Sequence, residues 1–242
     1  MKLKDKHILV IGGTSGVGRA IIELLLREKS LLTITTRNKK NIPNDWNLSN
    51  VKIIETDVSD DDSIKNLADN VTNIDGIVYT PGIVKLFPVG FINRNQLEIA
   101  RKSVFDGAVL TMTALLRGKK VNGGSSIVFI SSISSSFPFK GGMGYATSKA
   151  ALETYSKVLA IELAEKGIRS NCIKAGLVST QMNDDTKENI PDEKYKAYIE
   201  KYPLGLGSPE DIANAVVFLL SNKSKWITGT EIILDGGLTA GA

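Results

Sequence analysis

Residues 7–19 read HILVIGGTSGVGR, an apolar run that leads through a glycine-rich turn into a helical pattern. A glycine turn between a strand and a helix is the setting in which such turns bind dinucleotides. Glycines let the backbone pass close to a pyrophosphate, and free N–H groups at the helix start favour an anion. A tight turn with a purely structural role is the alternative. We expect a dinucleotide to contact Gly12, Thr14, Ser15, Gly16, Val17 and Gly18.

Beyond this unit, short β-branched runs alternate with longer stretches of helical period. Most of the runs are continuously apolar, as in strands buried on both faces of a parallel sheet. Strands are expected at 7–11, 31–36, 51–56, 74–79, 126–130, 170–174 and 231–234, and helices at 18–28, 63–71, 95–117, 145–165 and 209–220. The last helix has Ser208 as its N-cap and Asp211 in a capping box. The pattern predicts one single-domain, Rossmann-type α/β fold: a doubly wound, seven-stranded parallel sheet with helices on both faces.

The composition argues against several classes of protein. A hydrophobic share of 42% and a charged share of 23% in 242 residues are ordinary for a globular domain. The basic residues are scattered and the net charge is only +4, so we expect no nucleic-acid partner. One Cys and one His argue against a disulfide framework and a metal site. No apolar run approaches the ~18 residues of a membrane span, and no leader precedes the first strand. We therefore expect a cytoplasmic protein.

One polar segment interrupts the alternation before the last helix. Residues 183–202 read NDDTKENIPDEKYKAYIEKY. Loops of this length inside a compact domain are usually functional or mobile. We expect a lid-like insertion at about 183–203, with a solvated surface loop as the alternative.

The end of the second strand bears on the choice of cofactor. Thr36 stands where a carboxylate would accept hydrogen bonds from the ribose 2′-hydroxyl of NAD, and Arg37 follows it. An arginine pairs with a 2′-phosphate, so NADP(H) is favoured over NAD(H). A simple surface charge is the alternative for Arg37. After the third strand, Asp57 and Val58 offer the adenine a carboxylate and an apolar wall.

Tyr145 and Lys149 are four residues apart, which places a phenol and an ammonium on one helix face. A free phenol has a pKa of ~10, and a nearby cation lowers it by ~1–3 units, toward the range of efficient proton transfer. A tyrosine and a lysine four residues apart occur often by chance, so the spacing alone does not indicate a catalytic pair. Its position after a strand that ends in Ser132, in a chain with the glycine turn, predicts that Ser132, Tyr145 and Lys149 are catalytic.

Together these motifs resemble the short-chain dehydrogenase/reductase family, and within it the 3-oxoacyl-acyl-carrier-protein reductases. The resemblance extends over essentially the whole chain, through the ending at 207–213 and the glycines at 236–237. It implies that Asp57 contacts the adenine, and that Gly82, Tyr145 and Lys149 contact the cofactor. It also implies a nicotinamide-binding segment that contains Gly176, Val178 and Thr180.

The resemblance further implies hydride transfer between NADP(H) and a carbonyl or secondary alcohol. Reduction of a 3-oxoacyl thioester, as in fatty acid biosynthesis, is the first expectation, and another ketone, a sugar or a steroid is the alternative substrate. Ser132 would bind the carbonyl oxygen, Tyr145 would give the proton, and Lys149 would acidify the phenol and hold the ribose. In the family the helices at 95–117 and 145–165 pair across a two-fold axis, which implies a homotetramer.

Three departures from the family pattern leave other readings open. The family's N-N-A-G reads Tyr79-Thr80-Pro81-Gly82, its proton-relay Asn falls near Ser103-Val104, and the Pro before the nicotinamide glycine is Ala175. A cofactor-binding sensor or scaffold without catalysis is therefore one rival. A methyltransferase that uses S-adenosylmethionine is another, but Arg37 and the Tyr145–Lys149 pair argue against it.

Overall fold

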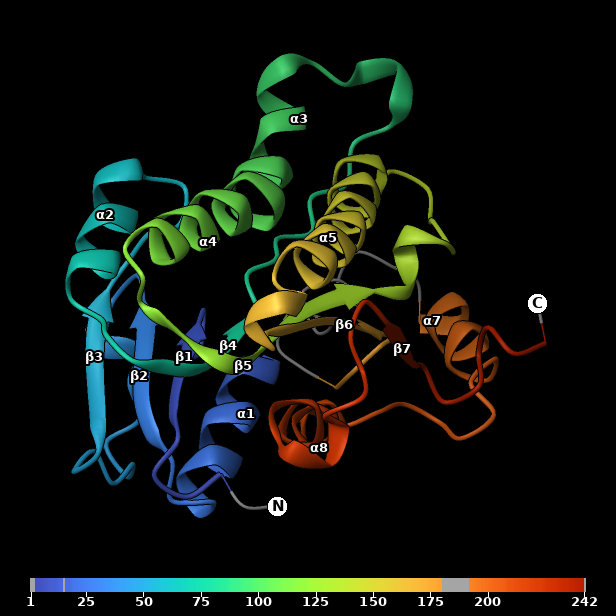
Figure 1. The fold of residues 1–242 in the computed structure, drawn as a ribbon. Helices are drawn as coiled ribbons and strands as arrows, with labels where there is room; N and C mark the ends of the chain where they lie inside the picture. Colours follow the sequence, from blue (N-terminus) through green and yellow to red (C-terminus); the bar gives the residue numbers. More distant parts are fainter. Residues whose placement is uncertain (1–2, 15, 180–191, 242) are drawn as a thin grey trace.

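The computed structural model describes residues 3–14, 16–179 and 192–241. Its seven strands form one parallel sheet in the order β3-β2-β1-β4-β5-β6-β7 (Figure 1). The strands are β1 His7–Ile11, β2 Leu31–Thr36, β3 Val51–Glu55, β4 Ile74–Tyr79, β5 Val121–Ser132, β6 Arg169–Ala175 and β7 Glu231–Leu234. The predicted doubly wound, seven-stranded sheet is confirmed, and β1 and β4 flank the point where the strand order reverses.

Helices cover both faces of the sheet, as predicted. They are α1 Gly16–Arg27, α2 Asp61–Asp69, α3 Arg94–Arg101, α4 Gly107–Arg117, α5 Met143–Glu162, α7 Asp192–Ile199 and α8 Pro209–Leu220. In Figure 1, α1 and α8 lie below the sheet, and α2, α4 and α5 lie above it. Two buried apolar clusters fill these layers, one around Ile22 and Val216 and the other around Met112 and Leu152. Strands buried on both faces explain the continuous apolar runs in the sequence.

The capping prediction for α8 is confirmed. The backbone N–H of Asp211 donates to Ser208 Oγ at 3.3 Å, and the N–H of Ser208 donates to Asp211 Oδ2 at 2.7 Å. These reciprocal bonds satisfy two backbone donors at the helix start.

The predicted helix at 95–117 is divided by a wider turn. A π-helical turn at Lys102–Asp106 separates α3 from α4. The Tyr79 hydroxyl donates to the carbonyl oxygen of Ser103 at 2.5 Å. A Cβ on Gly107 would lie 2.5 Å from the Val58 carbonyl oxygen, so only glycine lets the helix approach the loop after β3 and the end of β4 this closely. This turn contains the segment where the resemblance places the family's relay Asn.

Part of the predicted insertion is a helix, so the prediction of a loop over its whole length is wrong. Residues 192–199 form α7, and residues 180–191 lie outside the described part of the chain. The ring of Tyr198 meets that of Tyr202 edge to face, with centroids 5.6 Å apart. The buried Tyr202 hydroxyl accepts a hydrogen bond from the N–H of Leu177 at 3.1 Å. Because the helix sequence, DEKYKAYI, is mostly polar and has no clear apolar stripe, the sequence pattern did not reveal it. The lid role stays a prediction.

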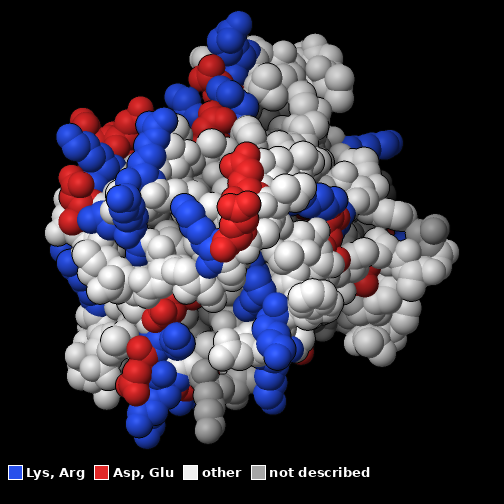
Figure 2. Space-filling view, in the orientation of Figure 1, with Lys and Arg blue, Asp and Glu red and all other residues white. Residues whose placement is uncertain are grey.

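The surface mixes charges of both signs. Figure 2 shows lysines and arginines interspersed with acidic side chains on the visible face. Within the described ranges, no helix combines the length and apolar character needed to cross a membrane.

Candidate active site

The residues predicted to bind a cofactor or to react lie where parallel strands end at one edge of the sheet. Gly12 follows β1, Gly82 lies beyond β4, Ser132 ends β5, and Gly176 follows β6. Ser132 is paired in register with Ala175 of β6. In doubly wound sheets ligands bind at this carboxyl edge, beside the point of strand reversal.

The glycine turn is shaped to let a ligand approach its backbone. Gly12 and Gly16 have φ angles of +80° and +50°, in the left-handed region that glycine adopts at little cost. A Cβ on Gly18 would lie 2.6 Å from the Gly12 carbonyl oxygen, so glycine is needed for α1 to pack this closely on the turn. Thr14 Oγ1 lies 3.3 Å from Thr36 Oγ1 and so ties the turn to β2. This geometry fits a pyrophosphate at the start of α1. Ser15 lies outside the described residues, and Val17 packs partly buried against the core.

Thr80 stands in the segment that departs from the family's N-N-A-G pattern, and it holds the glycine turn in place. Its Oγ1 lies 2.8 Å from the carbonyl oxygens of both Ile11 and Gly12, to which it donates. The hydroxyl therefore joins the end of β4 to the turn after β1. A Cβ on Gly12 would lie 2.7 Å from the same oxygen.

The residues after β2 and β3 that are expected to contact the 2′-phosphate and the adenine differ in their exposure to solvent. Arg37 and Asp57 are both exposed. Hydrogen bonds from the Ser59 hydroxyl and N–H lower the pKa of Asp57, and the charge of Arg37 adds to this shift. Val58 is only 8% exposed and belongs to the core cluster, so its apolar surface packs inside the protein.

The side chain of Ser132 lies close enough to Tyr145 to affect the pKa of its phenol. Ser132 caps the short turn Ile133–Ser135, where its Oγ accepts from the N–H of Ser134 at 3.2 Å. Burial raises the pKa of Tyr145, and the hydrogen bond with Ser132 offsets only part of this shift. The predicted lowering of the phenol pKa is therefore wrong for this structure, because desolvation outweighs any effect of the neighbouring cation. Tyr145 is protonated at neutral pH and can donate.

Lys149 is almost completely buried, at 2% exposure. Its ammonium donates to the carbonyl oxygen of Ile130 at 2.6 Å and to that of Pro81 at 3.4 Å. Nζ lies 5.6 Å from the centre of the Tyr145 ring. Burial lowers the pKa of Lys149 to about 8, against opposing effects of Cys172 and Glu153. A cation held at this distance by carbonyl oxygens faces the phenol without forming a salt bridge to it.

The segment after β6 runs close to the C-terminal part of the chain. The N–H of Gly176 donates to the Leu234 carbonyl at 2.8 Å, and a Cβ on Gly176 would lie 2.8 Å from Cα of Asp235. Val178 is buried and forms a parallel bridge with Gly207. Gly176 and Val178 are thus at the predicted edge, and Thr180 lies outside the described residues.

Other reactive groups do not join this constellation. Cys172 lies in β6, and burial raises the pKa of its thiol to about 12, so it is not a thiolate nucleophile. Among the described residues, no cluster of three or more His, Cys, Asp and Glu side chains is arranged to hold a metal.

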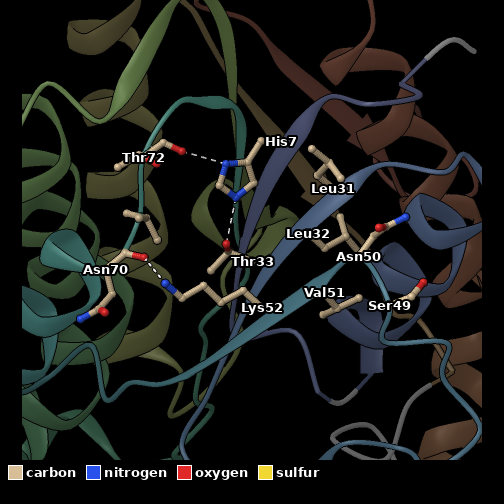
Figure 3. Close-up of a pocket in the computed structure, with 11 residues that line it drawn as sticks. His7, Leu31, Leu32, Thr33, Ser49, Asn50, Val51, Lys52, Asn70 and Thr72 are labelled. Atoms are coloured by element: carbon tan, nitrogen blue, oxygen red, sulfur yellow. Dashed lines mark hydrogen bonds between the residues drawn. The ribbon is translucent and has the colours of Figure 1, made fainter.

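A pocket of about 450 Å³ opens at the opposite edge of the sheet (Figure 3). It lies where β1, β2 and β3 begin, whereas Ser132 lies where β5 ends. His7 bridges the Thr72 carbonyl at 2.9 Å and Thr33 Oγ1 at 2.8 Å, and Lys52 donates to the Asn70 carbonyl at 2.6 Å. Their polar atoms are thus engaged in holding strand ends and loops, away from the candidate site.

Comparisons with known proteins agree with this geometry. A family model described as enoyl-(acyl carrier protein) reductase matches residues 12–239. The chain is 30% identical to a 2,5-dichloro-2,5-cyclohexadiene-1,4-diol dehydrogenase of Sphingobium indicum, over 99% of this chain and 98% of the relative. It is 34% identical to a 3-oxoacyl-acyl-carrier-protein reductase of Aquifex aeolicus, over 98% and 99%. A solved short chain dehydrogenase family protein from Francisella tularensis superposes with a TM-score of 0.86 at 30% identity, over 98% and 99%. The chain therefore belongs to the short-chain dehydrogenase/reductase family of nicotinamide-dependent oxidoreductases.

Proposed function

We propose that this oxidoreductase uses NADP(H) to interconvert a carbonyl and a secondary alcohol, with Ser132, Tyr145 and Lys149 as its catalytic residues. The observation that carries the proposal is the buried Lys149 ammonium, 5.6 Å from the centre of the Tyr145 ring, at the sheet edge where β5 ends in Ser132 and β1 leads into the glycine turn. A Cβ on Gly82 would lie 3.5 Å from Lys149 Nζ, so the loop after β4 passes the same ammonium.

In the direction of reduction, the Ser132 hydroxyl donates a hydrogen bond to the carbonyl oxygen of the substrate. A donor that meets developing negative charge in this way contributes ~3 kcal/mol to lowering the barrier. When bound, the nicotinamide cofactor supplies the hydride. Tyr145 gives its proton to the same oxygen, and the resulting phenolate is stabilised by Lys149. The raised pKa of Tyr145 suits a proton donor, since the group stays protonated at neutral pH.

The rate of carbonyl reduction is expected to fall as the pH rises past about 8, the pKa to which burial lowers Lys149. Below that pH the ammonium is charged and stabilises the phenolate that forms when Tyr145 gives its proton. Above it the cation is lost and the transfer becomes harder. The profile is measured as kcat for a ketone across neutral and alkaline pH, with saturating NADPH. A plateau that extends well beyond this pH would contradict the role of Lys149.

Arg37→Asp is expected to weaken NADPH binding by roughly 10- to 100-fold, because a charge-assisted phosphate contact is lost and a repulsion replaces it. NADH binding should change much less. The measurement is the Kd of each cofactor by fluorescence titration. Arg117→Asp, an exposed substitution at the end of α4, gives the same change in net charge as a control. If Arg37→Asp weakened the binding of NADPH and of NADH equally, the 2′-phosphate would not bind at Arg37.

The substrate class that we propose first is the 3-oxoacyl thioester. It is supported by the relative named as a 3-oxoacyl-acyl-carrier-protein reductase, while the diol dehydrogenase relative supports a cyclic alcohol or ketone about as well. A panel of acetoacetyl thioesters, cyclic ketones, aldoses and steroids, followed by NADPH absorbance, ranks these classes by kcat/KM.

A cofactor-binding sensor without turnover is the second candidate. It is favoured by the replacement of the family's relay amide: Val104 is fully buried, and the buried Ser103 Oγ has no hydrogen-bond partner among the described residues. NADPH binding without oxidation by any member of the panel would support this candidate over the enzyme.

We also propose a homotetramer. Apolar side chains on α4 and α5 remain exposed, namely Leu110 at 44%, Val158 at 41% and Ile161 at 78%. On β7, which ends the sheet, Ile233 is 51% exposed. Exposed apolar faces of this kind mark interaction surfaces. Light scattering coupled to gel filtration measures the mass of the assembly, and a monomeric mass at micromolar concentration would contradict the proposal.

A further inference from the structure

A buried ion pair lies directly behind the candidate active site. Glu153 of α5 and Lys174 of β6 are 3.2 Å apart, and their side chains are only 8% and 5% exposed. Glu153 follows Lys149 by one helical turn, and Lys174 lies in the last part of β6, just before Gly176. The pair is therefore held between the helix that carries the phenol and the strand that leads to the nicotinamide-binding segment.

The Lys174 ammonium joins four parts of the fold. Its three donors are matched by Glu153 Oε2 at 3.2 Å, Glu231 Oε2 at 3.2 Å and Ser136 Oγ at 2.6 Å. These acceptors come from α5, from β7 and from the segment just after Ser132. One side chain on β6 thus fixes the relative positions of three elements around the site.

Glu153 extends this set to the end of β5. Its second oxygen, Oε1, accepts a hydrogen bond from Ser131 Oγ at 2.5 Å. Ser131 immediately precedes Ser132, and its Oγ also approaches the carbonyl oxygen of Lys149 at 3.5 Å. The carboxylate therefore connects the strand that carries Ser132 to the helix face that carries Lys149.

Stability does not explain this arrangement. Removing two charges from water costs several kcal/mol each, and an apolar pair of similar volume is often as stable or more so. What a fully hydrogen-bonded buried ion pair provides is a defined relative position of the elements that it joins. Here that geometry belongs to the elements on which Ser132, Tyr145 and Lys149 lie.

We propose that Glu153 and Lys174 are positioning residues for the reaction: they hold the Ser132 end of β5 against the Tyr145–Lys149 face of α5, and the Glu153 carboxylate sets the electrostatic field at Lys149. This inference rests on the proposed function for its kinetic consequences. Among the described residues, the ionisable groups shown to act on or face Lys149 are Tyr145 and Glu153 on α5 and Cys172 on β6, and Lys174 is paired with Glu153. Glu153 raises the pKa of Lys149 against the effect of burial, so removing its charge lowers that pKa further.

The test compares a single and a double variant. Glu153→Gln removes one negative charge and leaves Lys174 in excess, so the alkaline limb of the kcat profile should move to lower pH by about one unit. Glu153→Gln combined with Lys174→Met restores neutrality, and the limb should return to its original place. The plateau kcat of the double variant should stay about tenfold below that of the parent, because the links to Ser131 and Ser136 are weakened. The KM for the ketone should change little.

Lys157→Met is the matched control. Lys157 is a lysine of α5 at the outer end of the same network, 53% exposed and paired with Glu231. Solvent screens such a pair, so its removal should leave the pH profile in place. Thermal unfolding and NADPH binding confirm that each variant is folded. If Glu153→Gln does not fold, Lys174→Met carries the same test with a shift to higher pH.

A readout without turnover keeps the two proposals separate. The phenolate of Tyr145 is titrated by ultraviolet difference absorbance against Tyr145→Phe in each background, and it should move to lower pH in the single variant, because a net positive charge favours phenolate. If the unsubstituted protein reduced no carbonyl, the proposed function would be wrong. The titration of Tyr145 would still test the electrostatic role of Glu153. An unchanged titration in the single variant would overturn the electrostatic role. A double variant with the parent's plateau kcat would overturn the positioning role.

Discussion

Tyr145→Phe is expected to lower carbonyl reduction by roughly 10²- to 10⁴-fold, the usual contribution of a positioned proton donor. The substitution removes the hydroxyl whose pKa Ser132 affects and keeps the ring that lies beside Lys149. NADPH binding should therefore persist. The measurements are kcat for the best ketone of the panel and the Kd for NADPH.

The control for this prediction is Tyr155→Phe, which makes the same chemical change nearly three turns further along α5. Tyr155 is partly buried and packs with Phe105 and Phe129 at the margin of the core, and burial raises the pKa of its phenol to about 12. It should keep the parent's rate. If Tyr145→Phe reduced ketones as fast as the parent, Tyr145 would not be the proton donor, and the roles assigned to Ser132 and Lys149 would fail with it.

Gly18→Ala is expected to weaken NADPH binding by about 10- to 100-fold and to lower the melting temperature. The added Cβ would lie 2.6 Å from the carbonyl oxygen of Gly12, and since that atom belongs to the backbone, α1 must move away from β1 to make room. Overpacking of this kind costs roughly 1–3 kcal/mol. The same movement displaces the N–H groups at the helix start from the pyrophosphate.

Fluorescence titration with NADPH and a thermal melt measure both effects. Gly90→Ala is the matched control, because a Cβ on Gly90 would meet no atom within 4 Å and Gly90 has no left-handed φ. It should leave Kd and melting temperature close to those of the parent. Tight NADPH binding by Gly18→Ala would mean that the pyrophosphate does not rest on this turn.

The fold was predictable because its signals are local and repeated. The runs that became β1, β2, β4 and β7 have the predicted bounds, since apolar and β-branched residues predominate in the strands of a parallel sheet. β5 began earlier than predicted, at Val121, because Gly123 and Gly124 give no strand signal. The helix at 192–199 was also missed, because its sequence, DEKYKAYI, is mostly polar and has no clear apolar stripe.

The candidate site was predictable only in part. Spacing placed Tyr145 and Lys149 on one face of a helix, and strand ends placed Ser132 and Gly12 at one edge. Helical spacing acts within a few residues, and the shared edge follows from the parallel arrangement of the strands. The partners of the buried Lys174 side chain come from three other parts of the fold, so no spacing in the sequence predicts them.

The order of residues along the chain was enough to specify a doubly wound sheet, a glycine turn for a dinucleotide and a phenol beside an ammonium, because periodicity and short motifs encode them locally. The direction of the Tyr145 pKa shift required the folded molecule. Burial raises it and outweighs the neighbouring cation, and burial is a property of everything packed around a group. The same holds for the ion pair of Glu153 and Lys174, whose two charges approach each other only after α5 has packed on β6.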